Sequence, residues 1–138
     1  MKVLLIAPDN GSYVSPFPLG LGYIAAVLRD NGHEVTIFNK DIYHYSAEYL
    51  TRYLDENQFD VVGSGTCGGY RQYREMKSIA AAVRKSINKT VFVLGGALVH
   101  PGTTIFSGFD ESRFYCSWRR RRDNERTLSS LGNWWRCA

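Results

Sequence analysis

Two apolar patterns alternate along the first hundred residues. Short aliphatic runs such as residues 2–7 are typical of strands buried on both faces, and segments such as residues 19–31 repeat apolar side chains at helical spacing. The predicted strands cover residues 2–7, 34–38, 60–63 and 90–94, and the predicted helices cover residues 19–31, 47–56 and 70–87. Because strands and helices alternate, the sequence predicts an α/β fold with a doubly wound parallel sheet.

Small residues gather directly after the predicted strands, where open parallel sheets bind their ligands. Residues 8–22, 64–70 and 95–104 are the three segments concerned. Glycines let a flat ligand or a phosphate approach the backbone, and Ser64 and Thr66 add hydroxyl donors. A tight turn without a ligand is the alternative, but two such loops at neighbouring strand ends favour ligand binding.

Composition limits the class of protein. The chain has 138 residues, 44% of them hydrophobic and 22% charged, which is typical of one globular domain. It contains neither a signal peptide nor an apolar run long enough to span a membrane, so we expect a cytoplasmic protein. Three cysteines without paired spacing predict neither a disulfide framework nor a zinc site.

Charge is distributed unevenly and suggests a boundary near residue 106. Residues 1–106 carry ten basic and nine acidic side chains, whereas residues 107–138 carry seven arginines, four acids and all three tryptophans. The predicted organisation is an α/β domain over residues 1–106 and an aberrant basic tail over residues 107–138. The run Arg119–Arg122 could contact nucleic acid, but no periodic apolar face would fix it on a folded element.

Five short segments of residues 1–106 carry a family resemblance: Pro18–Ala26, Gly32–Val35, Phe59–Gly63, Ser64-x-Thr66 and Gly95-Gly96. In them the chain resembles the cobalamin (vitamin B12)-binding domain that precedes the barrel of many radical S-adenosylmethionine (SAM) enzymes. The resemblance implies a Rossmann-like, flavodoxin-like cobalamin-binding fold. It also implies that the hydroxyl pair and the glycine pair line a slot for the nucleotide tail of cobalamin.

The resemblance implies a site that binds the cofactor and contains no catalytic residue and no metal ligand. His100 resembles a position beside the cofactor, with a solvated loop histidine as the alternative. The implied cofactor-binding residues are Ser15, Pro16, Leu19, Gly20, Tyr23, Ser64, Thr66, Cys67, Tyr70, Gly95, Gly96 and His100.

One departure concerns the lower face of cobalt. Cobalamin domains of the mutase and methionine synthase type carry Asp-x-His-x-x-Gly after the first strand, and the histidine ligates cobalt. Here the loop from Asp9 to Pro16 contains no histidine. A lower face without protein imidazole suits methyl transfer or the ring-forming chemistry of cyclases.

The motif of the radical SAM barrel, Cys-x-x-x-Cys-x-x-Cys, does not occur in this sequence. Its thiolates hold a 4Fe–4S cluster, so the cluster and S-adenosylmethionine are expected only in a missing barrel domain. The chain is then a cobalamin-binding module truncated before that barrel, inactive alone and without a nucleic-acid partner.

The tail also departs from the family, which continues with a fifth strand, a Gly-Glu-Gly-Glu turn and a helix. With AGA or AGG codons for its arginines, the segment from Ser112 read one nucleotide later can decode as ADFIVVGEGEETMKELYRVLETGGDA. We interpret residues 107–138 as a frameshift product in which the fifth strand and the last helix are lost. This interpretation removes most of the case for nucleic-acid binding.

Three other functions share parts of the pattern. Gly32–Thr36 also fits the first domain of a sugar-nucleotide glycosyltransferase, which would need a second nucleotide-binding domain. A phosphoacceptor receiver domain requires an aspartate where Ser64 stands. A nonenzymatic module that binds another small ligand is the third alternative, and titration with hydroxocobalamin separates it from the cobalamin reading.

Overall fold

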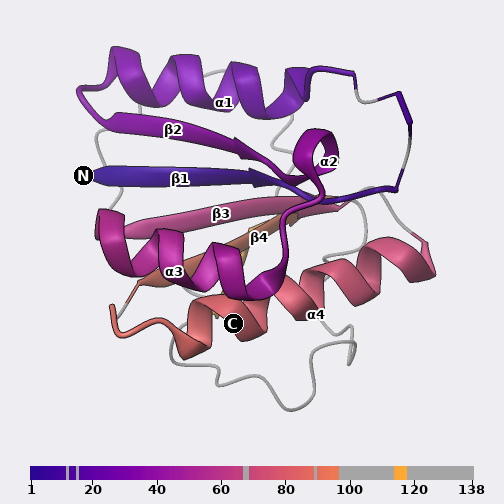
Figure 1. The fold of residues 1–138 in the computed structure, drawn as a ribbon. Coiled ribbons are helices and arrows are strands. Elements are labelled where there is room, and N and C mark those ends of the chain that lie inside the picture. Colours follow the sequence, from indigo (N-terminus) through magenta and orange to yellow (C-terminus); the bar gives the residue numbers. More distant parts are fainter. Residues whose placement is uncertain (12, 15, 67–68, 89, 97–113, 118–138) are drawn as a thin grey trace.

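The computed structural model describes residues 1–11, 13–14, 16–66, 69–88, 90–96 and 114–117, with backbone only for Thr66 and for 114–117. These residues form one parallel sheet flanked by helices (Figure 1). The elements are β1 (Lys2–Ala7), α1 (Leu19–Asp30), β2 (Glu34–Asn39), α2 (Lys40–Tyr43), α3 (Ala47–Asn57), β3 (Val61–Thr66), α4 (Tyr70–Lys85), β4 (Val91–Gly96) and β5 (Phe114–Ser117).

The strands lie in the order β2-β1-β3-β4-β5, and every described pair is parallel. The chain places β2 on one side of β1 and β3 on the other, so the strand order reverses between β1 and β3. This reversal is the switch point at which open α/β sheets bind their ligands. The doubly wound parallel sheet expected from the sequence is confirmed.

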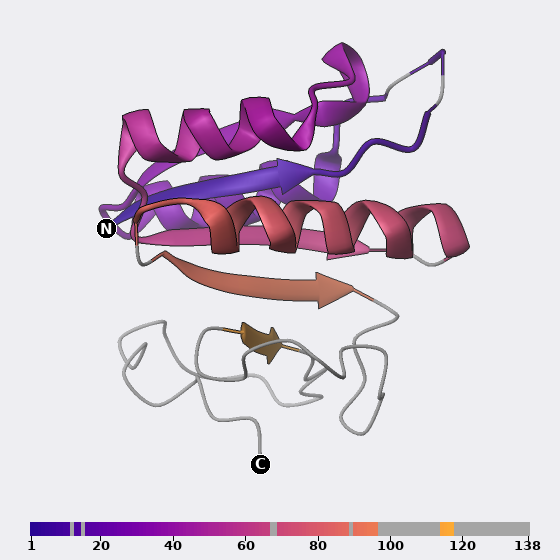
Figure 2. The ribbon, with the colours of Figure 1, turned by 60° about the horizontal axis from the view of Figure 1, so that its bottom comes forward.

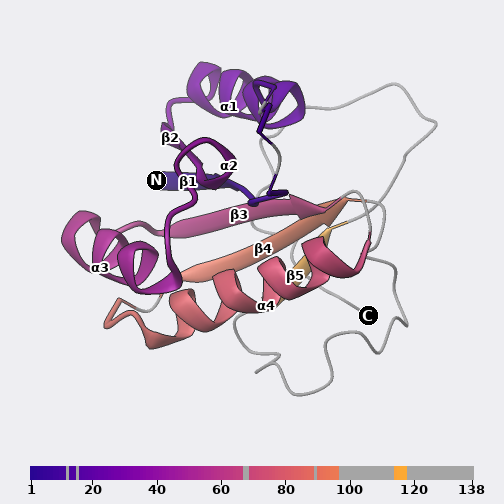
Figure 3. The same ribbon diagram turned by 45° about the vertical axis from the view of Figure 1, so that its right-hand side comes forward.

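Helices cover the two faces of the sheet unequally. Helix α1 packs over β1 and β2 on one face, and α3 and α4 pack side by side on the other (Figure 3). We call these the α1 face and the α3/α4 face. Because side chains alternate along a strand, Leu5 and Gly63 point to the α1 face, and Ile6 and Ser64 point to the α3/α4 face.

The main hydrophobic core lies on the α3/α4 face. Ser46 starts α3, with Oγ accepting a hydrogen bond from the Tyr49 amide at 3.2 Å, and Gln58 ends it in the left-handed conformation. The core joins both helices to four strands through Leu4, Ile6, Phe38, Leu50, Leu54, Phe59, Val62, Met76, Ile79, Ala80, Ala82, Val83, Phe92 and Leu94.

An aromatic cluster extends this core along β2, the edge strand. The Tyr45 and Tyr49 rings stack with centroids 4.3 Å apart, and the Phe38 ring lies 5.1 Å from Tyr45 and 5.0 Å from Tyr53. Burial, and secondarily the charge of Tyr49, raises the pKa of Tyr53. The rings extend the apolar packing of this face to the edge of the sheet.

Two strands continue past the ends that the sequence predicts. The runs expected to stop at residues 63 and 94 extend to Thr66 and Gly96. Glycine is uncommon inside strands, but Gly65 pairs with Gly95 and Thr66 with Gly96 in the ladder between β3 and β4. Pairing with a neighbouring strand therefore outweighs the low strand propensity of glycine.

The expected loss of the fifth strand is wrong. Residues 114–117 form β5, which pairs with β4 from Phe114 opposite Phe92 to Ser117 opposite Gly95 (Figure 2). Aromatic residues favour strands, and the strand ends before the arginine run starts at Arg119. The last helix lies outside the described residues, and the domain boundary at residue 106 stays a prediction.

Candidate functional site

The carboxyl ends of β1 and β3 bring together three segments. These are the loop after β1, the short helix α2 that follows β2, and the first turn of α4. The β1, β2 and β3 arrows run toward the end of the sheet where α2 lies (Figure 1). Helix α2 was not predicted from the sequence, although Asn39 caps it by accepting a hydrogen bond from the Asp41 amide at 3.0 Å.

Three glycines lie on the α1 face of β3 and β4. Leu5 covers the first, because a Cβ on Gly63 would lie 3.0 Å from Leu5 Cδ2, whereas Gly65 and Gly95 leave bare backbone among the described residues. Gly63, Gly65 and Gly95 share this face because Gly65 pairs with Gly95 and successive side chains alternate. Among the described residues, a Cβ on Gly95 would meet no atom within 4 Å, and one on Gly65 would lie 3.8 Å from the Gly95 carbonyl oxygen. We call these three residues the glycine strip. At its end Gly96 has a φ of 109°, which bends the chain out of the strand.

Ser64 lies on the opposite face from the glycine strip. Its side chain is buried, and Oγ donates to the Ile6 carbonyl oxygen at 2.9 Å and lies 3.7 Å from the Met76 sulfur. The hydroxyl therefore ties β3 to β1 and α4. Thr66 ends β3, and only its backbone is described.

The other predicted residues fall into two groups. Leu19 and Tyr23 in the first turns of α1, and Tyr70 at the start of α4, are 66%, 74% and 76% exposed, and Gly20 and Pro16 are exposed beside them. These exposed apolar side chains favour a binding surface near the switch point. Ser15, Cys67 and His100 lie outside the described residues.

A polar loop after β1 faces α2. Asp9 Oδ2 lies 2.9 Å from His44 Nδ1, and Asp9 Oδ1 accepts a hydrogen bond from the Gly11 amide at 2.6 Å. Burial raises the pKa of Asp9, but the bonds from His44 and Gly11 outweigh it and hold that pKa below its usual range. Sequence reasoning gave His44 no role, and its position after β2 was the only available signal.

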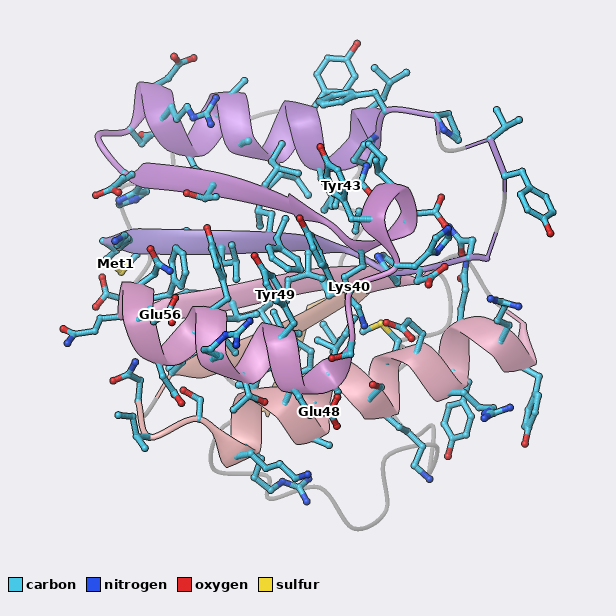
Figure 4. All side chains as sticks on the ribbon, viewed as in Figure 1. Met1, Lys40, Tyr43, Glu48, Tyr49 and Glu56 are labelled. Atoms are coloured by element: carbon cyan, nitrogen blue, oxygen red, sulfur yellow. The ribbon has the colours of Figure 1, made fainter. Side chains whose placement is uncertain are left out.

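A buried ion pair joins α2 to α4 at the same end of the sheet. The Lys40 ammonium, 3% exposed, contacts the Glu75 carboxylate directly (Figure 4). Such a pair fixes the relative position of the two helices, because removing either charge would leave the other buried without a partner.

Within the described part of the chain, no three His, Cys, Asp or Glu side chains are placed to hold a metal ion. No helix of that part is both long and apolar enough to cross a membrane.

Comparisons with known proteins add a family and a fold. A family model for the B12 binding domain matches residues 12–113. A solved structure of the radical S-adenosylmethionine methyltransferase TsrM from Kitasatospora setae, with cobalamin and a [4Fe-4S] cluster bound, superposes with a TM-score of 0.60 and 22% identity over 69% of this chain. A second TsrM structure, with tryptophan substrate and a SAM analogue, gives 0.59 and 23%, also over 69% of this chain.

The matched region corresponds to only 18% and 19% of those two TsrM chains. The chain described here therefore spans about a fifth of the length of the structures it matches. At this identity, the likeness shows a shared fold. No curated protein matches the chain significantly.

Proposed function

The chain belongs to the B12-binding domain family, whose model matches residues 12–113, and from this premise we propose that it is the cobalamin-binding module of a radical SAM enzyme of methyltransferase or cyclase type. The observation that carries the proposal is the glycine strip beside the switch point of the sheet. Cobalamin is a large cofactor with a nucleotide tail, and such a tail needs a surface from which side chains are absent.

The geometry of the strip fits the nucleotide tail. Gly65 and Gly95 pair across β3 and β4, and open space lies where a Gly95 side chain would stand. Helix α1 packs over β1 and β2, to one side of the strip. The tail would pack against backbone on this face, while Ser64 supports the strip from the other face.

The exposed apolar residues at the start of α1 give the proposal its second part. Leu19 and Tyr23 stand exposed at the carboxyl end of the sheet, with Tyr70 on α4. In our proposal they cover the corrin ring, and Pro16 and Gly20 let the ring approach the backbone. Ser15, Thr66, Cys67, Gly96 and His100 complete the proposed set.

Cobalamin would supply a carrier for the group that the parent enzyme transfers. The SAM and cluster chemistry belongs in our proposal to a separate barrel domain, because this sequence contains no Cys-x-x-x-Cys-x-x-Cys motif. The TsrM structures, with their cluster and SAM analogue bound, support that division. A cytoplasmic location is part of the same proposal.

Retention of hydroxocobalamin tests the strip directly. The full chain is mixed with hydroxocobalamin and desalted, and bound cofactor is measured by visible absorbance. We expect the unaltered chain to retain cobalamin and Gly95→Leu to lose it, because the leucine would fill the open space above the strip. Far-ultraviolet circular dichroism should stay the same, since a Cβ at this position meets no atom of the described residues within 4 Å.

Val91→Leu is the matched control. Val91 lies on the same strand and the same face as Gly95, at the other end of the ladder. The leucine in this variant therefore adds bulk away from the strip. This variant should retain cobalamin. Equal retention by Gly95→Leu and Val91→Leu would show that the strip is not the binding surface, and no retention by the unaltered chain would refute the proposed function.

A further inference from the structure

The loop after β1, residues 8–11, is fastened on the side of α2. His44 Nδ1 lies 2.9 Å from Asp9 Oδ2, and the Asn10 amide donates to Asp41 Oδ1 at 2.7 Å. Asp41 is buried, and its own amide donates to the Asn39 side chain at 3.0 Å. One donor, His44 Nδ1, and one acceptor, Asp41 Oδ1, therefore hold consecutive residues of the loop.

The same loop is fastened on the side of α4. Gln72 Nε2 donates to Asn10 Oδ1 at 2.8 Å. The Arg71 guanidinium lies against Gly11, where a Cβ would come within 1.8 Å of one of its nitrogens. The loop is thus held between two elements that the Lys40–Glu75 pair joins.

His44 combines an uncommon backbone conformation with a side-chain contact to the loop. His44 ends α2 with φ 49° and ψ 41°, in the left-handed region that non-glycine residues adopt at a cost. Its amide donates to the Lys40 carbonyl oxygen at 2.8 Å. Such a conformation persists where its surroundings fix it, and here the side chain reaches Asp9.

Resting on the proposed function, we propose that His44 is a positioning residue that fixes the loop after β1 for cobalamin binding and does not itself bind cobalt. The sheet order supports positioning over ligation. His44 follows the edge strand β2, whereas the glycine strip crosses β3 and β4, with β1 between them. His44 Nδ1 contacts Asp9, the Arg71 guanidinium acts on the Asp9 carboxylate, and Asp41 binds the neighbouring Asn10 amide.

Two variants separate the side chain from the backbone. Asparagine and glycine both tolerate the left-handed conformation, so neither adds strain at this position. Asparagine places an amide donor near the position of Nδ1, whereas glycine removes the donor. His44→Asn should therefore preserve the loop, and His44→Gly should release it.

Gln58→Gly is the matched control. Gln58 is the other non-glycine residue with positive φ in the described chain, at 48°, and it ends α3 before β3 begins. Gln58→Gly places glycine in the same left-handed backbone conformation as His44→Gly does, but at the opposite end of the sheet. It should alter neither the loop nor cobalamin binding.

The first readout needs no cofactor. Amide hydrogen exchange of Gly11, whose amide donates to Asp9, is measured by NMR in the cofactor-free full chain. We expect exchange about fivefold faster in His44→Gly, and unchanged in His44→Asn and Gln58→Gly. Equal exchange in His44→Gly and the unaltered chain would overturn the proposal.

The second readout is the dissociation constant of hydroxocobalamin. It should rise about fivefold in His44→Gly and return to the unaltered value in His44→Asn. An unchanged constant in His44→Gly, despite faster exchange, would show that the loop does not serve the cofactor. If the unaltered chain binds no cobalamin, the proposed function fails, and the exchange comparison still decides whether His44 positions the loop.

Electron paramagnetic resonance of the cob(II)alamin form separates positioning from ligation. The spectrum should be the same in the unaltered chain and in His44→Asn, because in this proposal His44 would not ligate cobalt. Nitrogen superhyperfine splitting that disappears in His44→Asn would identify His44 as a ligand and overturn the proposal.

Discussion

On the α3/α4 face of the sheet, fourteen buried apolar side chains of the described residues form one cluster, whereas the cluster on the α1 face has four. The four are Val3, Leu5, Ala25 and Val35, and they lie under α1 at β1 and β2. Toward β3 and β4 the same face carries half-buried valines and then the glycine strip.

This difference separates stability from binding. Free energy from apolar burial scales with the area removed from water, so most of it comes from the α3/α4 face. The α1 face contributes less of this free energy, and it can therefore offer bare backbone and exposed apolar side chains to a ligand. Binding surfaces are commonly drawn from such regions of low local stability.

The largest expected effect comes from two neighbouring residues of β4. Phe92 is fully buried on the α3/α4 face, and Val93 is half-buried on the α1 face. Phe92→Ala should lower the free energy of unfolding by about 3–5 kcal/mol and Val93→Ala by about 1 kcal/mol. Urea unfolding measures both, and equal losses would contradict the inequality of the two faces.

The sequence predicted the elements of both faces but only part of the site. Aliphatic runs and helical spacing located four strands and three helices, because burial leaves a strong pattern. The glycines indicate the correct end of each strand, but they lie inside β3 and β4 and not in the loops that follow. The sequence does not show this, because it does not show which residues of two strands pair.

Side-chain direction explains the rest of the difference. The sequence predicts that Ser64 and Thr66 line one slot with Gly95 and Gly96. Because side chains alternate along a strand, the Ser64 side chain points to the α3/α4 face, opposite to Gly65 and Gly95. The bond between Asp9 and His44 joins residues 35 positions apart, and no local pattern connects them. Helix α2 has only four residues, too few for a periodic signal.

The second prediction tests the α1 face by adding to it. A chain with the shifted-frame segment from Ser112 would carry an amphipathic helix after the fifth strand. In a doubly wound sheet that helix would cover the half-buried Val61, Val91 and Val93 of the α1 face and leave the carboxyl end of the strands, with Gly65 and Gly95, open. We expect a melting temperature about 5 °C higher, greater solubility and tighter cobalamin binding. Calorimetry and hydroxocobalamin titration measure these changes, and a chain that melts no higher would count against the frameshift interpretation.

The third prediction concerns the stability that the α3/α4 face contributes at high pH. The raised pKa of Tyr53 means that folding opposes loss of its phenol proton. Its contribution to stability is complete below the ordinary value of 10.0 and is lost as pH rises through the folded-state pKa. Tyr53→Phe keeps the ring stacking and removes this dependence.

Between pH 10 and pH 11.5, the unaltered chain should lose up to ~1 kcal/mol more than Tyr53→Phe. Urea unfolding at each pH measures the difference. Parallel curves for the two proteins would mean that burial of the phenol does not oppose its ionisation.

The smallest expected effect lies at the acid limit, in the loop after β1. The lowered pKa of Asp9 means that folding favours its carboxylate, so the contribution is complete above the ordinary value of 3.8 and is lost as pH falls through the folded-state pKa. Asp9→Asn keeps the side-chain shape without the charge. Relative to it, the unaltered chain should be more stable by ~0.5 kcal/mol at pH 6, and this advantage should disappear below pH 3. Because the Asp9–His44 pair lies at the rim of the sheet and outside the main core, a much larger difference would mean that the site end contributes to global stability, and the separation of the two roles would fail.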